Sequence, residues 1–349
     1  VGFSLGGFLV VLFTKTKVKE YRQVVSTTSL EAANHNANLL YPLALLATIL
    51  SVIYTIKQMG SASIMEIMNF RDELSEDDGK KMGAIGTIQL LLSVFVIIYT
   101  VAVKHAEIKL GKVKLTLLLF AFLYLTLLLG SKGMFIAFFS ALGYILLYQK
   151  MVKKRTMLFF VLSLLAILFL LLFLRGGGNE AAIEKDKFAE LLLTYSVTAL
   201  PALYLMKEHP PLVFGYYSFR VFYIWINKLG FDFSISPVLN DFTLSPIPGN
   251  VYTYLKPYYF DFGMIGIFLM PLIIGAFHCF IYYKSTQNKV QYFFFNAMFL
   301  YPLIMQGFEE NYFRQASNWA YIALVILILT KIKLNGNRSS NSNLQPQNS

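Results

Sequence analysis

The sequence predicts an all-α, polytopic integral membrane protein, and three observations lead to this fold class. Hydrophobic residues make up 56% of the 349 residues, the mean hydropathy is +0.58, and the chain contains long runs without any Asp, Glu, Lys or Arg. In hydrocarbon every backbone polar group needs a partner within the protein, so spanning segments are helices or strands of a closed barrel. Barrel strands alternate apolar and polar residues, whereas these runs are apolar throughout, which favours helices.

We expect about nine spans, because each uncharged run approaches the roughly 17–25 residues that cross a bilayer as a helix. In chain order the runs are 1–13, 39–56, 86–103, 115–129, 134–148, 157–174, 264–283, 291–306 and 316–330. The first run is cut short by the start of the chain, so we expect further N-terminal sequence, with one or two further spans.

The charges between the runs predict which side of the membrane each connection occupies. Alternating sides give one set 17 Lys and Arg against three acidic residues, and the other set 13 against 16. The first set is 15–38, 104–114, 149–156, 284–290 and the tail from residue 331. Positively charged connections stay in the cytoplasm, so the net charge of +11 is a topology signal rather than a sign of nucleic-acid binding. The lipid bilayer, with its anionic headgroups, is the expected partner.

Four regions follow from this layout. Residues 1–174 hold the N-terminal spans, 175–261 form a large external loop with interfacial helices, 262–333 hold the C-terminal spans, and 334–349 are a Ser/Asn/Gln-rich tail expected to be disordered. One alternative remains open within the loop, where the apolar segment 188–206 either lies in the interface or spans. If it spans, the later connections change sides.

Familiar enzyme motifs are missing. The chain has no P-loop, HExxH, GxSxG or CxxC motif, and its four histidines are scattered. The single cysteine, Cys279, falls inside a predicted span and excludes an intrachain disulfide. We therefore predict neither a metal site nor a cofactor.

The most specific stretch is 248–263, PGNVYTYLKPYYFDFG, which ends directly at a predicted span. It resembles the signature before a late span in the oligosaccharide repeat-unit polymerases, the Wzy-type family of O-antigen and capsule assembly. The turn 130–133, GSKG, agrees with this family, in which Arg often stands in place of Lys132. The large external loop between the middle and late spans agrees as well.

The resemblance implies a metal-independent membrane glycosyltransferase of GT-C-like architecture in the bacterial cytoplasmic membrane. Such enzymes transfer a growing glycan from undecaprenyl diphosphate to a new lipid-linked repeat unit at the outer face. The implied partners are these lipid-linked oligosaccharides, acting as donor and acceptor, together with a chain-length regulator and a flippase.

Candidate site residues follow from this chemistry. A diphosphate leaving group needs cations, for which Arg offers a bidentate fork and Lys a compact charge, and the acceptor hydroxyl needs a base. The catalytic candidates are Asp261, Arg220 and Lys256. The substrate-binding candidates are Arg314, Asn250, Tyr252, Tyr258, Glu309, Arg175 and Lys132.

Each candidate also has a structural interpretation. Lys256 and Arg314 could be interface anchors, Asp261 could cap the helix that follows it, and Glu309 with Glu310 could be solvated turn residues. The tyrosines could belong to the aromatic belt at the membrane surface.

Two other functions remain open. A flippase or transporter would carry ionisable groups within its spans, whereas here they gather in external segments, which favours a transferase. A ligase that moves finished glycan to another acceptor is not separated from a polymerase by these motifs.

Overall fold

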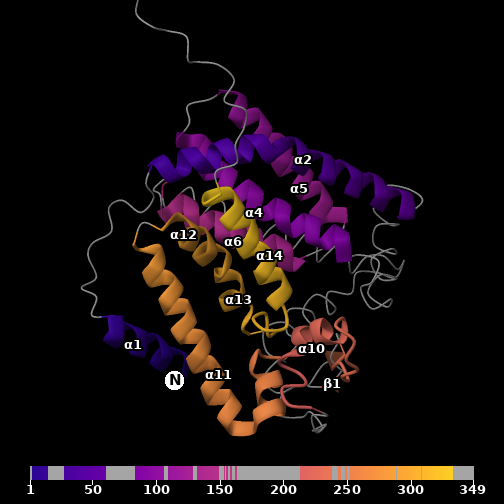
Figure 1. Ribbon diagram of the computed structural model, residues 1–349, viewed down its shortest axis with the longest axis vertical. Coiled ribbons are helices and arrows are strands. Elements are labelled where there is room, and N and C mark those ends of the chain that lie inside the picture. The colour runs from indigo at the N-terminus through magenta and orange to yellow at the C-terminus, as the bar shows by residue number, and fades with distance from the viewer. Residues whose placement is uncertain are drawn as a thin grey trace, which may run out of the picture.

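The protein is α-helical throughout the part of the chain that the computed structural model describes (Figure 1). That part comprises residues 2–14, 27–59, 83–105, 109–128, 132–148, 213–237, 243–244, 248–249, 252–287, 289–307 and 309–332, with the single positions 153, 155, 158 and 162. The all-α prediction is confirmed there, apart from one antiparallel pair of two-residue strands, β1 (Thr243–Leu244) and β2 (Pro248–Gly249).

The apolar runs became helices. The helices are α1 (Gly2–Thr14), α2 (Thr27–Met59), α4 (Gly83–His105), α5 (Lys109–Leu128), α6 (Lys132–Tyr148), α10 (Arg220–Asn227), α11 (Leu255–Ser285), α12 (Val290–Met298), α13 (Leu300–Met305) and α14 (Ala316–Thr330). The predicted run 291–306 is divided between α12 and α13, and each other run lies on a single helix except 157–174. That run falls almost entirely outside the described residues, and the segment 188–206 falls outside them as well.

Three of the described helices are long and apolar enough to cross a membrane, over Leu30–Lys57, Ile85–Val103 and Lys256–Ser285. Four shorter apolar stretches accompany them, at Gly2–Leu12, Gly133–Tyr148, Val290–Met305 and Ala316–Thr330. The chain is therefore a helical membrane protein.

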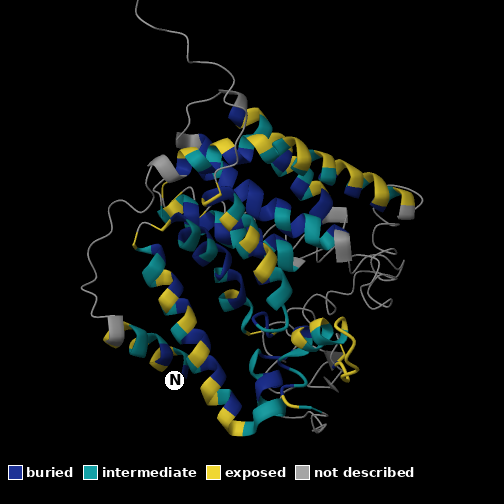
Figure 2. Ribbon diagram, in the orientation of Figure 1, coloured by how far each residue is buried: buried dark blue, intermediate teal, exposed yellow. Residues whose placement is uncertain are grey.

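Helix α4 is the centre of the bundle and packs against α2, α5, α6 and α14. Most of its side chains are buried, as its dark blue ribbon shows, whereas α2 keeps an exposed face (Figure 2). That face presents Leu43, Leu46, Leu50 and Ile53. A helix that is apolar all round belongs in the interior, and an exposed row of large aliphatic side chains suits contact with lipid.

The polar segment before the second predicted span is partly helical, which corrects the prediction that 15–38 is a loop. Helix α2 begins at Thr27, and the buried side chain of Asn36 explains why. Its amide nitrogen lies 3.3, 3.1 and 2.6 Å from the carbonyl oxygens of Ile328, Leu329 and Ile332. The last carbonyls of a helix lack partners within it, so Asn36 supplies the donor that the end of α14 needs.

Helix α11 also begins earlier than predicted, at Leu255 rather than at residue 264. Gly263 divides it, with φ of 62° and ψ of −147°. Glycine adopts a positive φ without steric cost, so the backbone changes direction there. The segment Leu255–Phe262 is called the entry segment below. Lys256, Tyr258 and Asp261 therefore lie on a short helical segment rather than in an irregular loop.

Candidate functional site

The candidate site forms where residues 213–237, the entry segment of α11 and the turn 309–315 meet, at the lower end of the view in Figure 1. Aromatic rings join the three segments. The ring centroid of Phe219 lies 5.4 Å from that of Phe313 and 6.0 Å from that of Phe262, and Tyr258 contacts Phe313 edge-on at 6.3 Å. Edge-to-face pairs in this range are favourable, so segments far apart in the sequence form one packed unit.

Asp261 holds residues 213–237 against the entry segment. Its Oδ1 accepts a hydrogen bond from the backbone N–H of Tyr217 at 3.0 Å, and its Oδ2 accepts one from Ser218 at 2.6 Å. Both donors come from a segment more than 40 residues earlier. These two donors belong to residues 213–237 and not to the helix that follows, which differs from the capping interpretation.

Two guanidinium groups meet at consecutive backbone carbonyls, and we call Arg220 and Arg314 the arginine pair. Arg220, at the start of α10, donates from Nε to the carbonyl of Ser236 at 2.8 Å. Arg314, in the turn before α14, donates from Nη2 to the carbonyl of Pro237 at 3.3 Å. Because each group uses a nitrogen of its fork to reach the same short segment, two positive charges gather beside residues 236 and 237.

The third predicted cation, Lys256, is buried at the start of the entry segment. Its Nζ lies 4.1 Å from the ring centroid of Tyr252 and 6.0 Å from that of Phe260. An ammonium over an aromatic face is attracted by the negative charge of that face. The ring of Phe260 lies 5.5 Å from that of Tyr217, which connects Lys256 to the segment that Asp261 holds.

Glu310 has the most hydrogen-bonded carboxylate among the described acidic residues. From the sequence it was one of four acids near the span ends that could act as a base, with Asp241, Asp261 and Glu309, but it was not among the preferred site residues. Its Oε1 accepts hydrogen bonds from the Tyr258 hydroxyl at 2.8 Å and from the N–H groups of Tyr312 at 2.7 Å and Phe313 at 2.9 Å. Its Oε2 accepts one from the N–H of Arg314 at 2.9 Å. Burial raises the pKa of this carboxyl, while the donors act in the opposite sense.

The two adjacent acids differ in exposure, although burial raises the pKa of both carboxyls. Glu309 is exposed, whereas Glu310 is 2% exposed. The solvated-turn interpretation is therefore wrong for Glu310. No local sequence signal separates the two residues, because the Tyr258 hydroxyl that reaches Glu310 lies 52 residues away.

Beyond the turn, buried polar contacts reach into the membrane-spanning part of α11. Tyr312 accepts a hydrogen bond from Gln306 Nε2 at 3.0 Å, and its hydroxyl lies 3.1 Å from His278 Nε2. The backbone N–H of Tyr254 bonds the carbonyl of Gln306 at 3.0 Å. These bonds fix the turn and the entry segment relative to α11 and α13. Arg314 belongs to this turn, so its backbone position is fixed as well.

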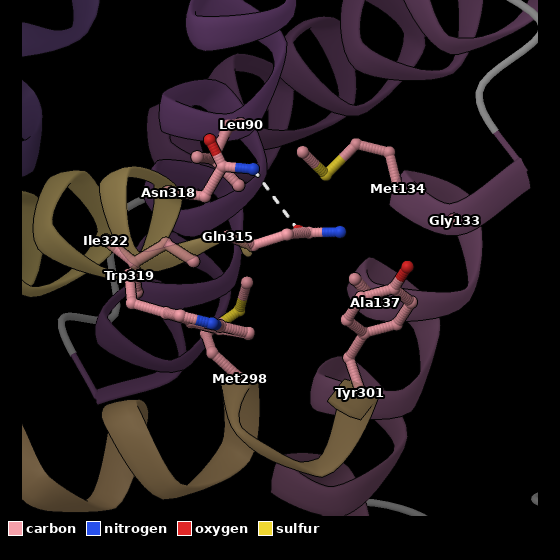
Figure 3. A pocket seen from close by; sticks show the side chains of 10 residues that line it. All are labelled: Leu90, Gly133, Met134, Ala137, Met298, Tyr301, Gln315, Asn318, Trp319 and Ile322. Carbon is pink, nitrogen blue, oxygen red and sulfur yellow. Dashed lines mark hydrogen bonds between the residues drawn. The ribbon is translucent and has the colours of Figure 1, made fainter. Parts of the chain in front are cut away.

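A cavity of about 210 Å³ lies between the start of α14, α13 and the start of α6 (Figure 3). Its lining residues are Leu90, Gly133, Met134, Ala137, Met298, Tyr301, Gln315, Asn318, Trp319 and Ile322. Gly133, the last residue of the GSKG sequence, lies in α6 rather than in a turn. A Cβ there would lie 2.7 Å from the Tyr301 hydroxyl, which would have to shift.

Several predicted residues fall outside the described part of the chain. Asn250 and Arg175 do so entirely, and Lys132 begins α6 although its side chain is not described. Among the described residues, His, Cys, Asp and Glu form no group of three that could hold a metal ion.

No protein-family model matches this sequence, and neither a curated protein nor a solved structure is similar to it at a significant level. The arrangement of the residues in the structure is therefore what indicates a function. That arrangement offers two guanidinium groups bonded to consecutive carbonyls, a buried lysine, a carboxylate in the same packed unit, and a cavity lined by the residue that follows Arg314.

Proposed function

We propose that this protein is a membrane glycosyltransferase that polymerises undecaprenyl-diphosphate-linked oligosaccharide repeat units into O-antigen or capsular polysaccharide. The proposed place of reaction is the outer face of the bacterial cytoplasmic membrane, in a GT-C-like helical architecture of about nine spans. The observation that supports this proposal most strongly is the arginine pair, since two guanidinium groups held at consecutive carbonyls suit an anion with several oxygens.

In the proposed reaction, a hydroxyl oxygen of the acceptor sugar attacks the anomeric carbon of the donor. A glycosidic bond forms, the bond from that carbon to the diphosphate oxygen breaks, and the hydroxyl proton passes to a base. Negative charge grows on the departing diphosphate, and Arg220 with Arg314 would offset it. Preorganised charges of this kind usually give the largest single contribution to catalysis.

Asp261 is the proposed base. Each of its oxygens accepts one backbone N–H, and a carboxylate offers about four lone-pair directions in all. Capacity for the proton of an acceptor hydroxyl therefore remains. Lys256 is proposed to add positive charge from the entry segment, and Tyr252, Tyr258 and Glu309 to complete the substrate contacts.

The test begins with deletion of the gene and a gel of surface polysaccharide. A polymerase defect leaves a single repeat unit without the ladder of longer chains. Loss of all surface glycan would indicate a flippase instead. Polymer that accumulates on its lipid carrier without transfer would indicate a ligase.

Complementation with charge-removing variants then tests the site. Arg220→Ala and Arg314→Ala should each lower the rate of polymerisation by about 10²–10³, the usual cost of removing one preorganised donor. Arg220→Lys should recover part of the rate, because the charge remains and the fork is lost. Lys228→Ala, at an exposed position at the end of α10, is the matched control and should support normal ladders.

Asp261→Asn removes the charge of this side chain and keeps a hydrogen-bond acceptor, so the same assay separates a role as base from a role in holding residues 217 and 218. An asparagine keeps one acceptor oxygen for residues 217–218 and loses the base. If Asp261→Asn and Arg220→Ala both polymerise at near-normal rates, the proposed site is wrong and these residues are structural anchors.

A further inference from the structure

The cavity lined by Tyr301, Gln315 and Asn318 has the size and chemistry of a site for one uncharged sugar ring. We propose that it binds a single pyranose of the lipid-linked glycan, an assignment that goes beyond the proposed function and rests on it. Its volume of about 210 Å³ is below the roughly 300–1,000 Å³ of sites for drug-sized ligands. One ring fits such a space, whereas a whole repeat unit does not.

The polar groups of the cavity are amides and a hydroxyl. Figure 3 shows the Gln315 side chain extending between Asn318 and Tyr301, with a hydrogen bond from Asn318 Nδ2 to Gln315 Oε1 of 3.2 Å. Amide groups both donate and accept hydrogen bonds, as sugar hydroxyls do. Among the described residues, the lining contains no Asp, Glu, Lys or Arg, so these residues offer an anionic ligand no counter-charge. A neutral hydroxylated ligand therefore fits best.

The remaining walls are apolar and aromatic. Trp319 is held by a hydrogen bond of 2.8 Å from Nε1 to the carbonyl of Asn311, and its ring lines the cavity with Met134 and Ile322. A pyranose has C–H groups on its faces and hydroxyls at its edge. Apolar walls with a few fixed polar groups are the usual composition of a small-molecule site, and this composition matches both parts of a sugar.

The position of the cavity favours a glycan over an unrelated metabolite. Gln315 follows Arg314 directly in the chain, so the turn that supplies one proposed diphosphate ligand also supplies a cavity wall. On the opposite wall, Gly133 belongs to the GSKG sequence. A substrate with a diphosphate joined to a neutral sugar chain would place a ring here while its phosphates contact the arginine pair.

The test uses saturation-transfer NMR on the purified, detergent-solubilised full chain. The probes are the methyl pyranosides of glucose, galactose, mannose and N-acetylglucosamine, with glucuronic acid as an anionic comparison. We expect transfer to at least one neutral glycoside and at least fivefold less to glucuronic acid. Absence of transfer to every neutral glycoside would overturn the proposal.

Two variants test whether the saturation transfer to a glycoside comes from binding in the cavity. Ala137→Phe fills it from α6, and Ala320→Phe makes the same change at an exposed position of α14. We expect Ala137→Phe to lower the transfer at least fivefold and Ala320→Phe to leave it unchanged. Equal transfer in both variants would refute the assignment. Asn318→Leu, which keeps the side-chain volume and removes the amide, should also weaken transfer and does not depend on Ala137→Phe folding.

Failure of this proposal and failure of the proposed function give different results. Cavity-dependent sugar binding in a protein whose deletion leaves the polysaccharide ladder intact supports the sugar site and refutes the polymerase. A deletion strain without ladder, together with glycoside binding that Ala137→Phe does not change, refutes the sugar site and supports the polymerase.

Discussion

Replacing the buried carboxylate of Glu310 should destabilise the turn that supports Arg314, by an amount that its hydrogen bonds predict. Oε1 accepts bonds from Tyr258, Tyr312 and Phe313, and Oε2 accepts one from the N–H of Arg314. Glu310→Ala leaves all of these buried donors without their acceptor. Glu310→Gln keeps an acceptor at the Oε1 position and turns its NH₂ group toward the N–H of Arg314.

The magnitude follows from the number of donors. Each buried donor left without a partner costs about 1–3 kcal/mol, so Glu310→Ala should cost at least about 4 kcal/mol and Glu310→Gln about 1–3 kcal/mol. One kcal/mol lowers Tm by about 2–4 °C in chains of 150–250 residues and by less in longer ones. At about 1–2 °C per kcal/mol for a chain of this length, we expect Tm to fall by at least about 4–8 °C for Glu310→Ala and by about 1–6 °C for Glu310→Gln.

The single cysteine of the chain provides the assay. Cys279 lies on α11, next to His278, which contacts Tyr312 of the same turn. A dye that fluoresces on reaction with a thiol reports the unfolding of the detergent-purified protein as Cys279 becomes accessible. Glu309→Gln is the matched control, because it makes the same chemical change at the exposed neighbouring position. Exposed substitutions usually stay within about 0.5 kcal/mol.

The order of the melting temperatures of the variants tests this prediction. Wild type and Glu309→Gln should melt together, Glu310→Gln lower, and Glu310→Ala lowest. If Glu310→Ala melts within about 1 °C of wild type, the hydrogen bonds of this carboxylate do not stabilise the turn, and the reasoning about the support of Arg314 fails.

Three further predictions test other parts of the structure. Burial raises the pKa of Glu310 above its ordinary value of 4.5, so its contribution to stability is full below that value and declines as pH rises through the native pKa. The pKa values of Asp261 and Glu309 are raised as well, so both proteins should lose Tm over this window, and wild type should lose more than Glu310→Gln measured in parallel. Asn36→Leu should cost about 1–3 kcal/mol, because the carbonyls at the end of α14 lose a buried donor, and an unchanged melting curve would contradict this role. In a Cys279→Ser background, a cysteine at Ser234 should react with an impermeant thiol reagent added outside intact cells, and a cysteine at Ser340 should not. The reverse pattern would mean that segment 188–206 spans the membrane.

The sequence alone determined the helices of this protein. Long uncharged runs are continuous and local, and hydrocarbon accepts only segments whose backbone bonds are internal. Such runs therefore predict α4 or α14 without reference to the rest of the chain. The same reasoning located the polar, aromatic segments that hold Arg220 and Lys256, because a run of mixed charge and aromatic residues interrupts the apolar pattern.

Helix ends were less predictable. The polar stretch before α2 and the segment before Gly263 are both helical, although their composition resembles that of connections. In each case the helix is extended by a distant partner. Asn36 bonds carbonyls of α14 almost 300 residues away, and Asp261 accepts N–H groups of residues 217 and 218. A local window of sequence holds neither partner.

Only the tertiary structure assigned individual roles within the candidate site. Glu309 and Glu310 are the same amino acid at adjacent positions, yet one is exposed and the other is buried with hydrogen bonds to both carboxylate oxygens. The meeting of Arg220 and Arg314 at Ser236 and Pro237 likewise depends on three segments that approach one another in space. Hydrophobic patterning specifies which segments are buried in the membrane, whereas hydrogen bonds between distant polar groups depend on the packing that brings those groups within about 3 Å of one another.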